Sequence, residues 1–290
     1  MTEPLLIKDA LEKSAEYLRA RGSSSPRLDA ELLLGHTLCL SRLQLYLNFD
    51  RPLAEEEKGR YRELLKRRAG HEPVAYILGE KEFMSLPFHV TPAVLIPRPE
   101  TEILVEEVMR KIDEWRGLHN ETMPNVLEVG IGSGAISISL LHHFPNLKIR
   151  ASDMSASALE VAGHNARRHG VMERLTLLHG DLFAGEGGLF DFILSNPPYI
   201  AETERNSLAP DIVEHEPPEA LFAGPEGLDV ISRIIREGVK ILAPGGWIFL
   251  EIGKNQLYKI KEVIKPIEEI KKVLTAEDHM GIVRLLFLQK

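Results

Sequence analysis

The chain has 290 residues, of which 44% are apolar and 27% charged, which is the composition of a globular protein with room for one large domain or two. Its net charge of −8 at pH 7 disfavours a broad nucleic-acid-binding surface, because such surfaces are basic. No apolar run approaches the roughly 20 residues that cross a bilayer, and the charged residues near Met1 leave no signal-peptide core. The single cysteine, Cys39, excludes an internal disulfide, so we expect a cytoplasmic protein with no membrane partner.

The charge is unevenly distributed along the chain. Residues 1–80 carry 13 basic and 13 acidic side chains, so the whole deficit falls on residues 81–290. A basic cluster within the neutral part consists of Lys58, Arg60, Arg62, Lys66, Arg67 and Arg68. Two interpretations are open: a solvated helix face balanced by nearby glutamates, which we favour, and a contact patch for an acidic or RNA-bearing partner.

Apolar residues recur at helical spacing through the first part of the chain. They predict helices over residues 5–21, 26–38, 42–47 and 54–68, with Ser41 as the cap of the third. Alternating apolar and polar residues then predict a hairpin over 82–90, and the prolines of 91–99 predict a stiff connector. We therefore expect three parts: a helical domain over 1–75, a hairpin and Pro-rich connector over 76–98, and a second domain over 99–290.

Strands and helices are predicted to alternate through the second domain, after a first helix over 100–115. Strands are expected over 126–129, 147–151, 175–178, 190–195, 247–252, 271–274 and 282–288. Helices are expected over 135–143, 156–169, 228–241 and 256–265, the third of them stopped by Pro244-Gly245-Gly246. This alternation predicts an α/β fold with a doubly wound, mostly parallel, seven-stranded sheet, in which the last two strands form an antiparallel edge pair.

A glycine-rich turn follows the first of these strands. It reads Gly130-Ile131-Gly132-Ser133-Gly134 and leads directly into a helix, whose N-terminal N–H groups and dipole favour an anionic group. Asp153 follows the next strand about 20 residues later, where an acid binds the hydroxyls of a ribose. A turn and an acid at this spacing favour a ribose-bearing ligand over a purely structural loop. Because Ala135 completes a G-x-G-x-x-A pattern, NAD is not excluded by this segment.

A second polar segment ends the strand over 190–195. There Asn196-Pro197-Pro198-Tyr199 brings an amide, two residues unable to donate to a sheet and an aromatic ring to the carboxyl edge, where ligands bind in open α/β sheets. This set suits a planar group that bears N–H bonds; the alternative is a strand-ending turn with Asn196 as a local cap. Asp181-Leu182-Phe183, after another strand, is expected to flank a base or to anchor a loop. The histidines lack metal-ligand spacing, so no metal site is predicted.

These segments together resemble a known family. They include Pro73–Glu80, the Ile-Pro-Arg-Pro-Glu-Thr-Glu run from Ile96 to Glu102, the glycine turn, Asp181–Phe183, Ser195–Ile200, Glu216–Leu221 and Leu250–Gly253. Over nearly its whole length the chain resembles the S-adenosylmethionine-dependent methyltransferases, and specifically the PrmC/HemK family of release factor glutamine methyltransferases. Ser85, Glu128 and Ile131 depart from the residues common in that family, which affects details of cofactor contact rather than the class.

The resemblance implies N5-methylation of the glutamine in the Gly-Gly-Gln motif of peptide chain release factors. We expect a monomer that does not act on DNA. It implies that S-adenosyl-L-methionine is held by Gly130, Ile131, Gly132, Ser133, Gly134, Asp153, Leu182 and Asn196. It further implies that the glutamine is bound by Asn196, Pro197, Pro198 and Tyr199, with Asn196, Pro197 and Tyr199 as the catalytic residues. The helical domain over 1–75 is the expected docking surface for the release factor.

The chemistry of an amide substrate accounts for this choice of residues. A carboxamide nitrogen is a poor nucleophile because its lone pair is delocalised. The side-chain oxygen of Asn196 and the carbonyl of Pro197 are each expected to accept one of its N–H bonds, which orients the nitrogen and stabilises positive charge that develops on it. Tyr199 is expected to stack on the amide plane. The alternatives are a nucleic-acid amino-methyltransferase, since Asn-Pro-Pro-Tyr occurs there too, and a noncatalytic protein that retains the cofactor fold.

Overall fold

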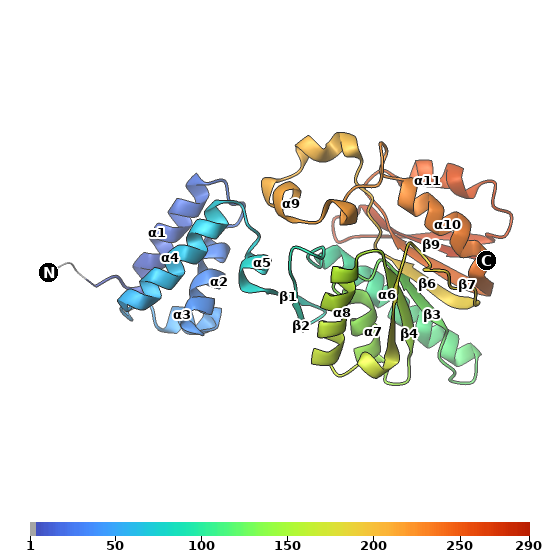
Figure 1. Ribbon diagram of the computed structural model, residues 1–290, viewed down its shortest axis with the longest axis horizontal. Coiled ribbons are helices and arrows are strands. Elements are labelled where there is room, and N and C mark those ends of the chain that lie inside the picture. Colours follow the sequence, from blue (N-terminus) through green and yellow to red (C-terminus); the bar gives the residue numbers. More distant parts are fainter. Residues whose placement is uncertain (1–3) are drawn as a thin grey trace. The chain divides into compact units, whose positions relative to one another are not determined.

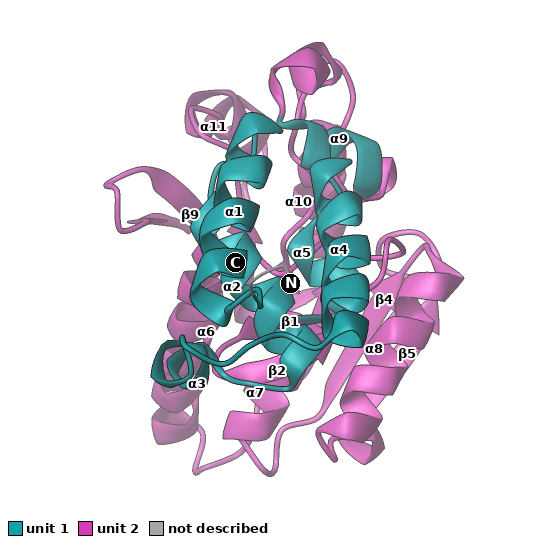
Figure 2. Ribbon diagram, turned by 90° about the vertical axis from the view of Figure 1, so that its left-hand side faces the viewer, with its two compact units in different colours: residues 1–80, 209–215 teal, residues 81–208, 216–290 magenta. Residues whose placement is uncertain are grey.

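The computed structural model describes residues 4–290, and the chain divides into two compact units (Figure 2). Unit 1 comprises Met1–Glu80 together with Ala209–His215, and unit 2 comprises Lys81–Leu208 together with Glu216–Lys290. The hairpin expected over 82–90 and the Pro-rich connector thus fall in unit 2, whereas residues 76–80, which were expected with them, fall in unit 1. Within residues 4–290, no helix is long and apolar enough to cross a membrane.

Unit 1 is built from helices, of which the first five in the chain surround one apolar core. The helices are α1 (Ile7–Ala20), α2 (Pro26–Leu38), α3 (Arg42–Leu47), α4 (Glu55–Ala69), α5 (Val74–Leu78) and α9 (Pro210–His215). The first four confirm the predicted helices to within two residues at each end. The predicted cap of α3 is confirmed: Ser41 Oγ accepts the backbone N–H of Gln44, whose side chain bonds back to the Ser41 N–H. Helix α5 was not predicted, because five residues carry too little periodicity.

The basic cluster in unit 1 is largely paired with acids. Lys58 bonds to Glu55 at 2.8 Å and Lys66 to Glu63 at 2.8 Å, as expected for a solvated helix face. Arg68 differs, because its side chain is buried and lies 2.7 Å from Asp29. This part of the cluster therefore belongs to the core of unit 1 rather than to its surface.

Unit 2 is a seven-stranded sheet with the order β5-β4-β3-β6-β7-β9-β8, which confirms the predicted fold class (Figure 1). The strands are β3 (Val126–Val129), β4 (Ile149–Asp153), β5 (Leu175–His179), β6 (Phe190–Ser195), β7 (Leu242–Glu251), β8 (Lys272–Glu277) and β9 (Val283–Gln289). β3 to β7 run parallel, whereas β9 is antiparallel to both β7 and β8, so the predicted antiparallel edge pair is also confirmed. A separate hairpin joins β1 (Glu80–Phe83) and β2 (Leu86–His89).

β7 begins earlier than predicted. We expected a turn at Pro244-Gly245-Gly246, but the strand already starts at Leu242. The C-terminal residue explains the difference, because Gly245 N–H donates to the Lys290 carbonyl at 3.0 Å and Lys290 N–H donates to the Gly246 carbonyl at 3.1 Å. A pairing partner more than 40 residues away thus extends a segment whose local sequence predicts a turn.

Helices cover both faces of the sheet in unit 2, as the alternating inward and outward side chains of each strand require (Figure 1). One apolar cluster joins the sheet to α6 (Pro99–Leu118), α7 (Ala135–His143) and α8 (Ala156–Arg168). The other joins it to α10 (Asp229–Ile241) and α11 (Leu257–Ile264). In β6, Phe192 and Leu194 belong to the first cluster and Ile193 to the second, so the strand is buried on both sides.

The strand order reverses between β3 and β6. From β3 the chain proceeds outward to β4 and β5, then returns to pair β6 with the opposite edge of β3. At such a reversal the connections after the two strands leave in opposite directions, which opens a crevice at their carboxyl ends. Gly130 follows β3 and Asn196 follows β6, so the fold brings the two predicted segments to this crevice.

Candidate active site

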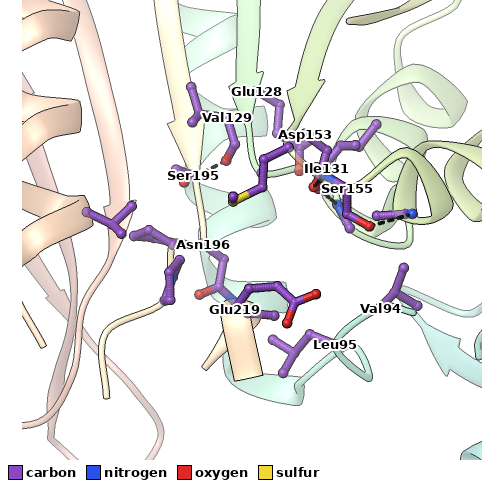
Figure 3. Close-up of a pocket in the computed structure, with 18 of the residues that line it drawn as sticks. Val94, Leu95, Glu128, Val129, Ile131, Asp153, Ser155, Ser195, Asn196 and Glu219 are labelled. Atoms are coloured by element: carbon purple, nitrogen blue, oxygen red, sulfur yellow. Dashed lines mark hydrogen bonds between the residues drawn. The ribbon is translucent and has the colours of Figure 1, made fainter. Parts of the chain in front are cut away.

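A cavity of about 410 Å³ lies at this crevice, entirely within unit 2 (Figure 3). A volume of this size is within the range of about 300–1,000 Å³ typical of small-molecule sites. Predicted site residues that line it are Gly130, Ile131, Gly132, Ser133, Asp153, Leu182, Asn196, Pro197 and Pro198. The tertiary structure therefore brings most of the predicted cofactor and substrate segments into one cavity.

The backbone of the glycine turn faces this cavity directly. Gly130 and Gly132 have φ of 75° and 54°, a conformation in which a Cβ is strained. A Cβ built at either position meets no atom within 4 Å and would project into open space. Gly134 differs: it caps α7 with φ of 86°, a Cβ there would lie 2.6 Å from Ile138, and it does not line the cavity.

Asp153 ties the glycine turn to the neighbouring strand. One carboxylate oxygen accepts the N–H of Gly132 and the other accepts the N–H of Ser155, each at 2.9 Å. Each carboxylate oxygen has a further lone pair, so Asp153 is able to accept ribose hydroxyls as well. The acid is thus fixed at the rim of the cavity by two backbone bonds.

Glu128 lies deeper, in the middle of the buried strand β3. Its Oε2 accepts both the N–H of Ser137 at 3.0 Å and the Ser137 hydroxyl. Burial raises the pKa of Glu128 to about 8, and the charge of Asp153 adds to the rise. An acid within an apolar strand is the sequence signal that points to this residue, because a buried carboxyl needs a partner or a ligand.

Asp153, Asp181 and Glu219 give the cavity lining negative charge, whereas the buried Glu128 is mostly protonated at neutral pH. Its two arginines are each paired with an acid: Arg98 with Glu216 at 2.5 Å, and Arg233 with Asp181 at 2.6 Å. The cavity therefore favours a ligand that carries positive charge. Figure 3 shows Glu128 and Asp153 toward one side of the cavity and Glu219 toward the other.

Asn196 lies at the point where β6 leaves the sheet. Ser195, just before it, donates its hydroxyl to the Val129 carbonyl at 2.7 Å, which joins the ends of β6 and β3. The Asn196 side chain donates from Nδ2 to Thr101 Oγ1 at 3.0 Å. Thr101 in turn donates to Glu251 Oε2 at 2.6 Å. Asn196 is thus held at the cavity by a short chain of buried polar side chains.

Tyr199 is not one of the described residues that line the cavity. Its hydroxyl donates to Glu251 Oε1 at 3.2 Å, and its carbonyl accepts a bond from Gln256 Nε2 at 2.7 Å. Its ring packs against the apolar cluster that includes the buried side of α10. The structure therefore gives Tyr199 a place beside Glu251, and stacking on a substrate amide stays a prediction.

A buried acid connects two further segments of the cavity wall. One carboxylate oxygen of Glu216 accepts the backbone N–H of Ile96 at 3.4 Å. The other oxygen of Glu216 lies 2.5 Å from Arg98 Nη2. The sequence left open a pairing of Arg98 with Glu100, whereas the structure pairs it with Glu216, 118 residues away. Local sequence gives no signal for such a partner.

Thr101, Glu216 and Glu251 were missed as individual site residues, although all three fall in segments that carry the family resemblance. Glu251 was open to the same argument as Glu128, because it is an acid within a buried strand. Leu182 was predicted as a cofactor-binding residue, and its backbone carbonyl accepts a hydrogen bond from the Ser152 hydroxyl. Within residues 4–290, no group of three or more His, Cys, Asp or Glu side chains has the arrangement of a metal site.

The sheet order, the open glycine turn and the acidic cavity at the strand reversal define the class of S-adenosylmethionine-dependent methyltransferases, whose cofactor bears a ribose and a sulfonium charge. Two family models match: the PrmC N-terminal domain over residues 9–79 and the methyltransferase small domain over 102–224. A release factor glutamine methyltransferase of Rhodopirellula baltica is 38% identical over 290 residues, with 99% of this chain and 97% of that protein covered. One of Geobacter sulfurreducens is 41% identical over 251 residues, with 86% and 85% covered. The chain belongs to the release factor glutamine methyltransferase family, and its cofactor is S-adenosylmethionine.

Solved structures show the same fold at low sequence identity. The hMettl16 catalytic domain in complex with a 3′UTR hairpin matches with a TM-score of 0.56 and 18% identity, over 83% of this chain and 84% of that one. The 16S rRNA methyltransferase RsmC of T. thermophilus, in complex with AdoMet and guanosine, matches with a TM-score of 0.52 and 19% identity, over 73% and 49%. At these identities the likeness concerns the fold alone.

Proposed function

We propose that this protein transfers a methyl group from S-adenosylmethionine to the side-chain nitrogen of the glutamine in the Gly-Gly-Gln motif of peptide chain release factors. The observation that carries the proposal is the meeting of Asn196 and residues 130–133 of the glycine turn at one cavity. The names of its relatives support the same substrate.

The turn, Asp153 and Leu182 are the residues proposed to hold the cofactor. The N–H groups and open glycine positions of the turn suit the amino-acid part, and Asp153 suits the ribose hydroxyls. Acidic walls favour the net positive charge of the molecule. When bound, the cofactor supplies an electrophilic methyl group.

Asn196 and Pro197 are the residues proposed to bind the substrate amide, with Pro198 beside them and Tyr199 as a stacking ring. The Asn196 Oδ1 and the Pro197 carbonyl each accept one N–H bond of the glutamine side chain. These bonds orient the nitrogen and strengthen as positive charge develops on it, which lowers the barrier to transfer. A general base is not required before the transfer, because the nitrogen loses its proton afterwards.

Unit 1 is proposed as the docking surface for the release factor, and α3 offers the clearest contact. Leu43 is 69% and Leu47 74% exposed, although both are large apolar side chains. The changes Leu43→Ser and Leu47→Ser together are expected to raise KM for the release factor at unchanged kcat. Tyr258, also 76% exposed, provides the control, since Tyr258→Ser is expected to leave KM unchanged. An unchanged KM in the α3 variant would refute docking through this helix.

The proposed substrate also implies a cytoplasmic location, where release factors act. We further propose that the protein acts as a monomer, because residues of one chain line the cavity. Transfer of labelled methyl groups to a purified release factor tests the function. Label is expected in the wild-type reaction, and its loss is expected when the Gly-Gly-Gln glutamine or Asn196 is replaced by alanine. Label in RNA or DNA, with none in release factors, would instead support a nucleic-acid amino-methyltransferase, which the relatives do not favour.

A further inference from the structure

A polar chain of buried side chains runs from Asn196 into the interior of unit 2. Asn196 Nδ2 lies 3.0 Å from Thr101 Oγ1, and Thr101 Oγ1 lies 2.6 Å from Glu251 Oε2. Thr101 and Glu251 are 4% and 1% exposed. They come from the first turn of α6 and the end of β7, so two elements distant in sequence converge on the side chain that ends β6.

We propose that Thr101 and Glu251 are positioning residues that fix the orientation of the Asn196 carboxamide and so leave its oxygen for the substrate. This inference rests on the proposed function, because it concerns the amide that binds the glutamine nitrogen. It adds two residues to the site that do not themselves contact the reacting atoms.

Hydrogen-bond counting determines the orientation. A carboxamide has an oxygen and an NH2 end of nearly equal shape, so packing alone does not distinguish them. The Thr101 hydroxyl has a single proton, which it donates to Glu251 Oε2 at 2.6 Å, while Glu251 Oε1 accepts the Tyr199 hydroxyl. Thr101 can then only accept a bond from Asn196, which requires the NH2 end to face it. The Asn196 oxygen therefore points away from Thr101 and is available to an N–H donor.

The reversed amide would disable the site. An NH2 group in place of the oxygen would face the N–H bonds of the glutamine, and two donors repel each other. Without the Thr101 hydroxyl, both orientations of Asn196 become accessible, and the fraction of productive complexes falls. The loss is therefore expected in kcat at saturating substrate, while the cofactor contacts at the glycine turn stay intact.

The test compares Thr101→Val, which removes the hydroxyl at similar volume, with Thr101→Ser, which retains it. The matched control is Ser139→Ala in α7, which removes another buried hydroxyl that bonds a backbone carbonyl at 2.7 Å. Measurements are kcat, KM for the release factor, cofactor affinity by calorimetry and Tm. Thr101→Ala serves as a second hydroxyl-free variant if the valine protein does not fold.

The valine variant is expected to lose on the order of tenfold or more in kcat, as misplaced reacting groups do, with cofactor affinity within threefold of wild type. The serine variant and Ser139→Ala are expected to retain kcat within about threefold. A valine variant with wild-type kcat, or a serine variant as impaired as valine, would overturn the positioning role. If the wild type itself transfers no methyl to a release factor, or Asn196→Ala stays fully active, the proposed function fails, and the positioning role fails with it.

Discussion

The carboxylate of Asp153 accepts the backbone N–H of Gly132 at 2.9 Å. This bond joins the acid at the end of β4 to the glycine turn after β3, two segments that border the same cavity. An interaction of this kind links the shape of the turn to the identity of the acid. Changes on either side of it are therefore expected to affect cofactor binding together.

Replacing Asp153 by asparagine is expected to weaken cofactor binding at least tenfold, or about 1.4 kcal/mol. The amide has one acceptor oxygen, so it cannot satisfy the N–H groups of both Gly132 and Ser155. Calorimetric titration with S-adenosylhomocysteine measures the loss. Asp191→Asn is the matched control, since Asp191 also accepts a backbone N–H, from Asn125 at 2.8 Å, but does not line the cavity. Equal affinities for the two variants would refute the role of Asp153.

A Cβ on the glycine turn is expected to abolish most cofactor binding. Gly132→Ala combines the strain of φ at 54° with a methyl group that projects into open cavity space. Gly170→Ala isolates the strain, because φ there is 67°, no atom lies within 4 Å, and the residue does not line the cavity. Both variants are expected to lose about 1 kcal/mol of stability, and only Gly132→Ala is expected to lose affinity. If the two variants bind the cofactor with equal affinity, the methyl group added at residue 132 does not contact the cofactor.

Cofactor binding is expected to release a proton from Glu128 near neutral pH. Burial raises the pKa of Glu128 to about 8, so the free protein holds this carboxyl mostly protonated at pH 7. A cationic ligand favours the carboxylate and lowers the pKa, so affinity is expected to rise with pH up to about 8.

Calorimetry in two buffers with different ionisation enthalpies measures this proton release directly. Glu128→Gln cannot release a proton and is expected to bind with the same observed enthalpy in both buffers. A wild-type enthalpy that is also independent of the buffer would show that Glu128 keeps one protonation state throughout.

Glu216→Gln is expected to raise KM for the release factor severalfold, with little change in cofactor affinity. Glu216 holds Ile96 and Arg98 against the segment that carries Glu219, and a neutral amide weakens the charge-assisted bond to Arg98. Leu95 precedes Ile96, and Glu219 follows Glu216 by three residues. Figure 3 shows Leu95 and Glu219 on the side of the cavity away from Glu128. Steady-state kinetics with varied release factor measures KM.

The matched control for that change is Glu107→Gln. Glu107 forms a surface pair with Arg110 at 2.6 Å, and surface pairs contribute about 0–1 kcal/mol. The KM of the Glu107→Gln variant for the release factor is expected to equal that of the wild type. If Glu216→Gln weakens binding of the cofactor as much as binding of the release factor, the bonds of Glu216 support the whole cavity and have no selective effect on the substrate.

Much of this architecture follows from short-range patterns. The alternation of strands and helices predicts the parallel sheet, and the boundaries of β6 match the apolar run that precedes Asn196. The glycine turn and Asp153 are recognisable because their spacing reflects one strand-turn-helix unit followed by one strand. The errors arise where distant partners intervene, as at β7, where Lys290 pairs with residues that otherwise favour a turn.

The sequence by itself determined the class of fold, the glycine turn, the acid at the end of β4 and the amide at the end of β6, because each of these depends on residues near one another in the chain. Only the tertiary structure decided that Thr101 lies between Asn196 and Glu251, 95 and 150 residues away respectively, and that Arg98 pairs with Glu216. The physical reason is that strand order determines which side chains meet at the edge of a sheet. Local periodicity defines each strand, whereas the burial of both faces of the whole sheet selects that order.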